Sequence, residues 1–312
     1  MAGLQQKVKN FLVGLGPDNK LTQTALQLHA RRAGFKVEFS DPTRIWIEKD
    51  KRRIALARRD LTFVPIMMEV MELFFDSIES KTVNGDEVLD FSQPAFHVYK
   101  STGQGFFFPS IPEEDPLAQY TYWYTPKEGD ILWDAGAYCG ATTCMLAQMV
   151  GPTGKVYAFE PDDLNYAYLE KNIAHHGLTN VIPVRKALSD KSGVARFYMG
   201  GTMASGISDF VVYSDSKQMK EVPTISMEDA CAELGCVPDF VKMDIEGAEL
   251  ALIRGAKEFL KQHPVNFAIE SYHRVDGEYT YVKLDPLFAE IGYEYESHDR
   301  FKQMFTWARP KS

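Results

Sequence analysis

The pattern of hydrophobic and polar positions divides the chain into two parts. In the first part, helical patterns at residues 21–33 and 63–78 flank residues 35–58, where apolar and polar residues alternate. This alternation, with turn residues between the runs, predicts a small antiparallel meander. Residues 88–108 add two or three further short strands. We therefore predict a small α+β appendage over residues 1–115.

The second part, residues 116–312, alternates predicted strands and helices at a repeat of about thirty residues. Most of the predicted strands are short apolar runs, as is typical of strands buried on both faces. This alternation indicates a parallel sheet with crossover helices, so we predict a doubly wound α/β domain. The predicted strands cover residues 131–133, 156–159, 181–184, 239–244 and 265–270, with a final antiparallel pair at 293–295 and 301–307. The predicted helices cover residues 141–150, 162–176, 249–260 and 281–291.

An inserted hairpin is predicted after the third of these strands. Residues 194–198 and 210–213 would be its two arms, and glycines near positions 200 and 206 its flexible tip. Such a tip could fold over a bound ligand. Before the first strand, a connector carries four aromatic residues that could either wall a substrate pocket or pack against the sheet. They are Tyr120, Tyr122, Trp123 and Tyr124.

Composition and charge narrow the class of protein. The 312 residues are 45% hydrophobic and carry a net charge of −9, so a nucleic-acid partner is not expected. The four cysteines lack the spacing of a metal site, and no secretion signal is recognised, which predicts a reduced, cytoplasmic protein. The most apolar window, Phe63–Phe75, is too short to span a bilayer, so we expect no stable membrane insertion.

The first strand of the second part leads into a glycine loop that begins with an acid. Asp134, Gly136 and Gly140 form the pattern Asp-x-Gly-x-x-x-Gly, and the glycines let a ligand approach the backbone. A dinucleotide-binding loop has the pattern Gly-x-Gly-x-x-Gly and receives a pyrophosphate. The leading acid here would repel a pyrophosphate and suits a ligand with an amino group, which points to S-adenosylmethionine. The alternative is a structural turn with incidental glycines.

An acidic residue at the end of the next strand argues against that alternative. Glu160 directly follows the apolar run at residues 156–159. In open α/β sheets, an acid at this place accepts hydrogen bonds from ribose hydroxyls.

A second polar cluster is predicted at the carboxyl ends of the fourth and fifth strands. It contains Asp244, Glu246, Glu270 and His273. Titration near neutral pH would suit His273 to act as a general base, although a hydrogen-bonded loop histidine is the alternative. Asp244, Glu270 and His273 could also hold a divalent cation, because metals accept mixed carboxylate and imidazole ligands. We consider a metal possible but do not expect one.

Together these motifs resemble the FkbM family of S-adenosylmethionine-dependent methyltransferases, over about residues 125–308. The resemblance implies a doubly wound, seven-stranded Rossmann-like sheet of strand order 3-2-1-4-5-7-6 with an antiparallel seventh strand. It also implies O-methylation of sugars or polyketide-type natural products. The motifs that carry it are residues 134–140, 156–161, Asn172, residues 187–190 with Gly193, residues 241–249 with 254–256, and Ile269, Glu270 and His273.

The resemblance also implies roles for single residues. Gly136 and Gly140 would hold the methionine moiety, with Asp134 near its ammonium group. Glu160 would bind ribose, and Ala187 and Leu188 would border adenine. Tyr138 and Cys139 stand where the family often has Asn, which could alter the contact to the methionine part. The predicted cofactor-binding set is Asp134, Gly136, Ala137, Tyr138, Gly140, Glu160, Pro161, Ala187, Leu188, Ser189 and Asp244, and the predicted catalytic set is His273, Asp244 and Glu270.

The expected reaction moves a methyl group from S-adenosylmethionine to a hydroxyl of a small-molecule acceptor and leaves S-adenosylhomocysteine. Two alternatives are a nicotinamide-dependent oxidoreductase on a similar sheet and a non-catalytic scaffold that binds the cofactor. The appendage could cap the active site, bind substrate or form a homodimer.

Overall fold

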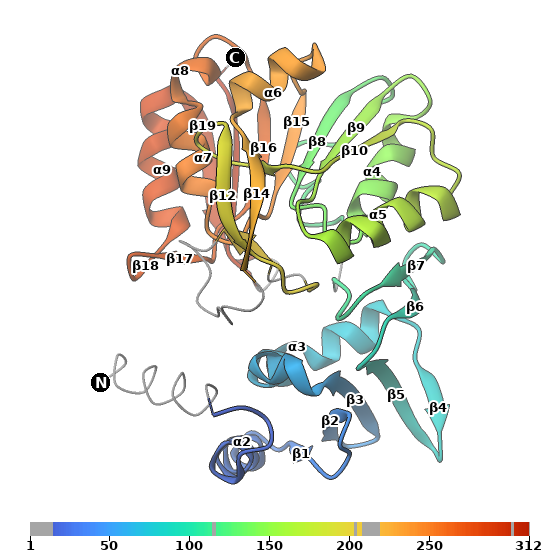
Figure 1. Cartoon of the computed structure of the whole chain (residues 1–312). Helices are drawn as coiled ribbons and strands as arrows, with labels where there is room; N and C mark the ends of the chain where they lie inside the picture. Colours follow the sequence, from blue (N-terminus) through green and yellow to red (C-terminus); the bar gives the residue numbers. More distant parts are fainter. Residues whose placement is uncertain (1–14, 114–116, 203–204, 208–218, 301–302, 312) are drawn as a thin grey trace. The chain divides into compact units, whose positions relative to one another are not determined.

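The computed structural model divides the chain into two units, residues 1–114 and 115–312, each with its own sheets (Figure 1). None of the helices in the residues described here is long and apolar enough to cross a membrane. The described residues are 15–113, 117–202, 205–207, 219–300 and 303–311.

The first unit is built on a five-stranded sheet of order β1-β2-β3-β5-β4. The first three strands form the predicted antiparallel meander, while β3 pairs with β5 in parallel, which the alternation does not predict. The strands are β1 (Lys36–Glu38), β2 (Arg44–Lys49), β3 (Arg52–Ala57), β4 (Lys81–Val83) and β5 (Asp86–Phe91), followed by a separate pair, β6 (Ala95–Val98) and β7 (Gly105–Phe108). The helices are α2 (Lys20–Arg32), the 3-10 helix η1 (Arg58–Phe63) and α3 (Val64–Ser77).

The apolar segment that could have suggested a membrane anchor is a core helix of this unit. In α3, Met67, Met71 and Phe74 are buried, whereas Glu69 and Glu72 are exposed. The buried positions recur every three or four residues, as expected for one face of a helix that packs on a sheet.

The second unit contains a seven-stranded sheet of order β10-β9-β8-β15-β16-β20-β19. The first five of these strands are parallel, and β20 and β19 run antiparallel to their neighbours. With the strands counted along the chain, this is the order 3-2-1-4-5-7-6 that the family resemblance implies. The strands are β8 (Ile131–Ala135), β9 (Lys155–Phe159), β10 (Val181–Val184), β15 (Phe240–Met243), β16 (Asn266–Glu270), β19 (Tyr293–His298) and β20 (Phe305–Pro310).

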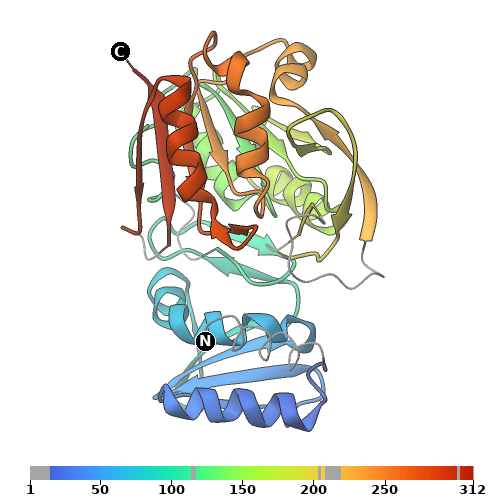
Figure 2. The same cartoon turned by 90° about the vertical axis from the view of Figure 1, so that its left-hand side faces the viewer.

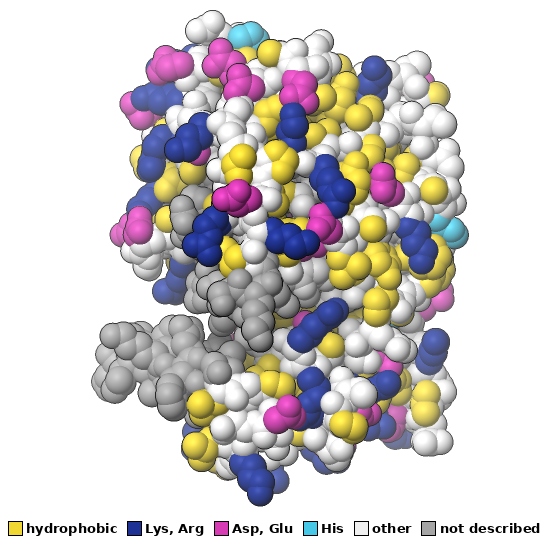
Figure 3. Space-filling model, viewed as in Figure 1, with side chains coloured by type: hydrophobic (Ala, Val, Ile, Leu, Met, Phe, Trp, Pro, Cys, Tyr) yellow, Lys and Arg dark blue, Asp and Glu magenta, His cyan; other side chains and the backbone are white. Residues whose placement is uncertain are grey.

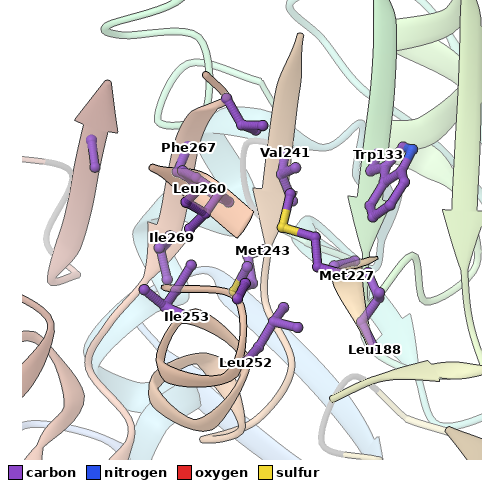
Figure 4. Packing of buried hydrophobic residues seen from close by; sticks show 14 of the residues in the cluster. Trp133, Leu188, Met227, Val241, Met243, Leu252, Ile253, Leu260, Phe267 and Ile269 are labelled. Atoms are coloured by element: carbon purple, nitrogen blue, oxygen red, sulfur yellow. The ribbon is translucent and has the colours of Figure 1, made fainter. Parts of the chain in front are cut away.

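Helices cover both faces of this sheet, because successive strand residues enter opposite cores. Leu132 packs into a cluster with Leu146 and Leu169, from α4 (Ala141–Val150) and α5 (Asp163–His175). The next residue, Trp133, packs into a cluster on the other face (Figure 4). That face carries α6 (Met227–Leu234), α7 (Glu249–Gly255), α8 (Lys257–Leu260) and α9 (Thr280–Ile291), with α7 and α9 side by side (Figure 2).

Two predicted elements differ in detail. The predicted helix at residues 249–260 is interrupted at Ala256 and forms α7 and α8. The inserted segment forms a small sheet of order β11-β14-β12-β13, in which β12 pairs with β14 rather than closing a short hairpin. Its strands are β11 (Ala187–Leu188), β12 (Gly193–Tyr198), β13 (Gly206–Ile207) and β14 (Met219–Ile225). The predicted hairpin arm at residues 210–213 lies outside the described residues.

The buried acid Asp60 in η1 makes the stability of the first unit depend on pH. Its side chain accepts a hydrogen bond from the Ser110 hydroxyl at 3.3 Å, and burial raises the pKa of its carboxyl to about 6. The folded chain therefore keeps this proton up to about pH 6, whereas the unfolded chain releases it near pH 4. The free energy of unfolding should fall by up to about 3 kcal/mol as pH rises through this window.

Asp60→Asn cannot ionise and keeps an oxygen for Ser110, so it should flatten this pH dependence. Urea unfolding of the intact chain at several pH values, followed by tryptophan fluorescence, to which Trp46 of the first unit contributes, would measure it. The exposed Asp76→Asn is the matched control. Equal pH slopes in the wild type and Asp60→Asn would refute the assignment.

Candidate active site

A pocket opens at the carboxyl ends of β8, β9 and β15 and contains about 360 Å³ of empty space, part of it open to solvent. Ligands of open α/β sheets bind at this edge. Six predicted cofactor residues line the pocket: Gly136, Glu160, Pro161, Ala187, Leu188 and Asp244. The lining residues that were not predicted as cofactor residues are Phe159, Phe197, Ser205, Gly206, Ile207, Ile245 and Ala248.

The glycine loop lets the ends of β8 and β15 approach closely. Gly136 has φ +77°, and a Cβ atom there would lie 1.8 Å from the backbone oxygen of Asp244. Gly140 has φ +82°, and its Cβ would lie 2.4 Å from Leu169 Cδ1. Side chains are therefore excluded at both positions by backbone conformation and by space. Asn172 supports the loop from α5, because its side-chain amide donates to the Cys139 carbonyl at 2.8 Å.

Glu160 occupies the place that the sequence predicts for it. One carboxylate oxygen accepts from the Tyr138 N–H at 2.9 Å, and the other accepts from the Asp162 N–H at 2.8 Å. Tyr138 reaches this position with φ +50°, which is unusual for a residue other than glycine. Burial raises the pKa of Glu160 to about 8. The backbone thus holds a carboxyl group at the pocket wall.

Asp162 connects Glu160 to the inserted segment. One oxygen of its carboxylate caps α5 by accepting from the N–H groups of Leu164 and Asn165. The other oxygen accepts from the Gly201 N–H at 3.0 Å and from the Ser205 hydroxyl at 2.9 Å. The segment that brings Ser205, Gly206 and Ile207 to the pocket is therefore tied to the same residue that donates to Glu160.

Asp134 has partners that the sequence did not reveal. It is fully buried, and its carboxylate accepts from the Thr143 hydroxyl at 2.5 Å and lies 3.1 Å from Lys242 Nζ. Lys242, also fully buried, donates to the Gly136 carbonyl at 2.7 Å. Asp134 does not line the pocket. Its contacts with Thr143 and Lys242 stabilise the glycine loop, and its predicted contact with an ammonium group stays a prediction.

The other predicted cofactor residues lie behind the pocket wall. Ala137, Tyr138 and Gly140 belong to the buried glycine loop. Ser189 is buried beyond Leu188, where its N–H donates to the Ile225 carbonyl and its hydroxyl donates to Asp190 at 3.1 Å. The structure places these residues next to the pocket without making them its lining.

His273 lies among three carboxylates. Its Nδ1 is 3.0 Å from Glu249 Oε1, and its Nε2 is 3.5 Å from Glu246 Oε2 and 3.8 Å from Asp244 Oδ1. Burial alone lowers the pKa of His273, but Glu249, Glu246 and Asp244 outweigh it and raise the pKa well above the ordinary value. A raised pKa favours the imidazolium form, which donates a proton and does not accept one, so the role of His273 as a general base stays a prediction.

Glu270 contacts Tyr120 rather than His273. The Tyr120 hydroxyl donates to the Glu270 carboxylate, and burial, with the charge of Asp244, raises the pKa of Glu270 well above its usual range. Of the three predicted catalytic residues, Asp244 lines the pocket. Glu249, which was not among the predicted site residues, lies beside His273, where Glu270 was expected.

The aromatic connector mainly packs against the sheet, the second of the two predicted options. Tyr124 stacks on Phe240 with ring centroids 5.4 Å apart, and Tyr122 meets Trp307 edge-on at 5.0 Å. Tyr120 also packs against Phe305, at 5.5 Å. Its hydroxyl is the part of the connector that reaches the carboxylates at the strand ends.

Comparison with known proteins identifies related sequences. The sequence model of the family described as the methyltransferase FkbM domain matches residues 134–295. The hexuronic acid methyltransferase AglP of Haloferax volcanii is 32% identical over 149 residues, which cover 47% of this chain and 57% of AglP. The 31-O-demethyl-FK506 methyltransferase FkbM of Streptomyces tacrolimicus is 25% identical over 180 residues, covering 48% of this chain and 68% of that protein.

Among solved structures, a similar one is the methyltransferase FkbM from Methylobacillus flagellatus. It has a TM-score of 0.44 and 18% identity, and the match covers 61% of this chain and 45% of that protein. The matched stretch thus spans less than half of that protein and little more than half of AglP.

The close approach at Gly136 predicts a large effect of a small side chain. Gly136→Ala should destabilise the chain by about 3 kcal/mol or more beyond its control, because its Cβ overlaps a backbone oxygen that cannot move aside easily. The control is Gly177→Ala, which has φ +61° but nothing within 4 Å of its Cβ. Urea unfolding of both variants measures the difference, and equal losses would show that backbone strain alone matters.

The buried ion pair predicts strong coupling between Asp134 and Lys242. Lys242→Met leaves the Asp134 charge buried without its cation and should cost about 3–5 kcal/mol of stability. Adding Asp134→Asn removes that charge and should recover part of the loss. Lys261→Met, which breaks an exposed pair with Glu258, should cost less than about 1 kcal/mol. If the stability losses of Lys242→Met and Asp134→Asn, measured by thermal unfolding, simply add in the double variant, the coupling is contradicted.

Proposed function

Because the chain belongs to the methyltransferase FkbM family, we propose that it transfers the methyl group of S-adenosylmethionine to a hydroxyl of a small molecule. The observation that carries this proposal is the position of Glu160. It lines the pocket beside Gly136, held by two backbone N–H groups. A carboxylate at the end of the second strand is the acceptor that a ribose diol requires.

The pocket suits S-adenosylmethionine on two further grounds. Gly136 lines the pocket and has no side chain, so a ligand there can lie against the loop backbone. The strand ends are rich in carboxylates, and a cationic ligand is favoured there over a pyrophosphate. When bound, S-adenosylmethionine supplies a methyl group on a positively charged sulfur. Glu160 would hold its ribose, while Ala187 and Leu188 would border its adenine.

We propose that the chain contributes mainly by positioning the acceptor hydroxyl. Asp244 would accept the hydroxyl proton, because it lines the pocket and burial raises its pKa toward the working range of a base. His273, 3.8 Å from Asp244, would stabilise the negative form of that carboxylate. Glu270 would fix Tyr120 at the rear of the site. This assignment keeps the three predicted catalytic residues and moves the base from His273 to Asp244.

We propose that the acceptor is a hydroxyl-bearing sugar or natural product. The two curated relatives are named as methyltransferases of a hexuronic acid and of 31-O-demethyl-FK506. A nucleic-acid acceptor is disfavoured by the net charge of −9 and by the interspersed acidic and basic side chains on the face shown in Figure 3. The first unit would serve this domain as a cap, a substrate-binding surface or a homodimer contact.

Ligand binding tests the cofactor directly. S-adenosylhomocysteine should raise the unfolding temperature of the wild type, whereas NAD should not. Glu160→Ala removes the ribose acceptor and should weaken S-adenosylhomocysteine binding by roughly tenfold or more, as measured by calorimetry. Glu170→Ala, an exposed change on α5, should bind as the wild type does.

Stabilisation by NAD instead would favour the oxidoreductase alternative. Unchanged affinity in Glu160→Ala would remove the main support for the cofactor site. Binding without any transfer of labelled methyl to a panel of sugars, hexuronic acids and macrolides would favour a scaffold.

A further inference from the structure

The carboxyl ends of β15 and β16 hold more carboxyl groups than cationic side chains among the described residues around them. Asp244, Glu246 and Glu249 all lie within 4 Å of the single imidazole of His273. Lys242, the nearby lysine, is 3.1 Å from a further carboxylate, that of Asp134. One imidazole can balance the charge of one of these three carboxyl groups, and burial makes the ionisation of the others unfavourable unless a further cation is present.

The donor atoms have the spacing of a coordination site. Single oxygens of Asp244 and Glu249 and a ring nitrogen of His273 all lie within 4.8 Å of one another. Ligands at about 2.1–2.4 Å from a common ion lie about 3–4.8 Å apart, so a divalent cation could sit between these atoms with small side-chain adjustments. Glu246, 3.5 Å from His273 Nε2, could add a further oxygen.

A second observation concerns the hydrogen bonds of these groups. The Glu249 side chain is fully buried, and two backbone N–H groups, of Ile245 and Gly247, donate to its Oε1 at 3.1 Å. Its Oε2, by contrast, is buried without a hydrogen-bond partner. Both ring nitrogens of His273 face the carboxylates without making a hydrogen bond of normal geometry, and its side chain is only 9% exposed. Buried polar atoms without a hydrogen bond are unusual, and a bound ion is one partner that would satisfy them.

We propose that Asp244, Glu249 and His273 bind a divalent cation next to the pocket, with Glu246 as an additional ligand, and that the cation replaces the proton of the imidazolium, so that His273 binds in its neutral form. A site that combines several carboxylates with one imidazole and no thiolate suits Mn²⁺ or Mg²⁺ better than a structural zinc ion. Asp244 is shared between this site and the pocket lining. A cation bound to Asp244 would therefore be able to contact an acceptor molecule in the pocket.

The chemical use of the cation rests on the proposed function. Such a cation would lower the pKa of a hydroxyl bound to it, and the second oxygen of Asp244 would take the hydroxyl proton. The oxygen lone pair then forms the new C–O bond, while the electrons of the broken C–S bond stay on sulfur and give S-adenosylhomocysteine. A vicinal diol or a hydroxy acid, which offers two oxygens to one cation, is the acceptor class that such a site would select.

Metal binding can be tested without cofactor or acceptor. The intact chain, freed of metal with a chelator, should bind one Mn²⁺ per chain in calorimetry and in the loss of the free-ion Mn²⁺ electron paramagnetic resonance signal. Glu249→Gln and His273→Asn should each weaken this binding by roughly tenfold or more. Glu258→Gln, whose side chain is 74% exposed on α8, should leave it unchanged.

The variants separate the cation site from the rest of the proposal. Circular dichroism and thermal unfolding would select the variants that fold, and His273→Asn keeps the test valid if Glu249→Gln does not fold. Stoichiometric Mn²⁺ binding that both folded variants weaken supports the site. Absence of stoichiometric binding, or equal binding in the variants, overturns it. S-adenosylhomocysteine binding is measured separately. A chain that binds S-adenosylhomocysteine but not Mn²⁺ would reject the cation site alone. A chain that binds Mn²⁺ but not S-adenosylhomocysteine would reject the proposed cofactor.

Discussion

The buried ion pair between Asp134 and Lys242 is the interaction on which the site depends. It joins the end of β8 to β15, and Lys242 also donates to the carbonyl of Gly136. Two buried charges are tolerated only while they are paired. A shift of either strand would leave a buried charge without its partner and would destabilise the fold. The glycine loop, the Asp244 backbone against it and the pocket wall are all positioned relative to this pair.

The elements of the second unit could be read from its sequence because local signals and tertiary packing agree there. The apolar runs at residues 131–133 and 181–184 are strands, since strands covered on both faces favour continuous apolar runs. Glu160 was also predictable, because its place after the second strand is fixed by topology. By contrast, the parallel pairing of β3 with β5 joins strands that are distant in sequence, and no local pattern encodes it.

The electrostatics of the site could not be read in the same way. Asp134 looked like a ligand contact because it leads the loop, but its partners Thr143 and Lys242 come from other elements. The sequence placed His273 near Glu270, whereas the fold turns its ring toward Glu249, the first residue of α7. A pKa depends on burial and on every nearby charge, so it becomes predictable only when the side chains are placed in space. Phe197 and Ile207 reach the pocket wall through strands of the inserted sheet, and only the fold reveals that contact.

The bonds of Asp162 have an evolutionary consequence. One carboxylate caps α5 and anchors the inserted segment, and the backbone of the same residue holds Glu160. Inserted segments usually diverge freely, because their ends are their only link to the domain. Here the segment is hydrogen-bonded to Asp162, whose backbone N–H holds Glu160 in the pocket wall. Related proteins that change this segment to accept new molecules would have to keep the hydrogen bonds of Gly201 and Ser205 to Asp162. Without them, the position of Glu160 would change together with the segment.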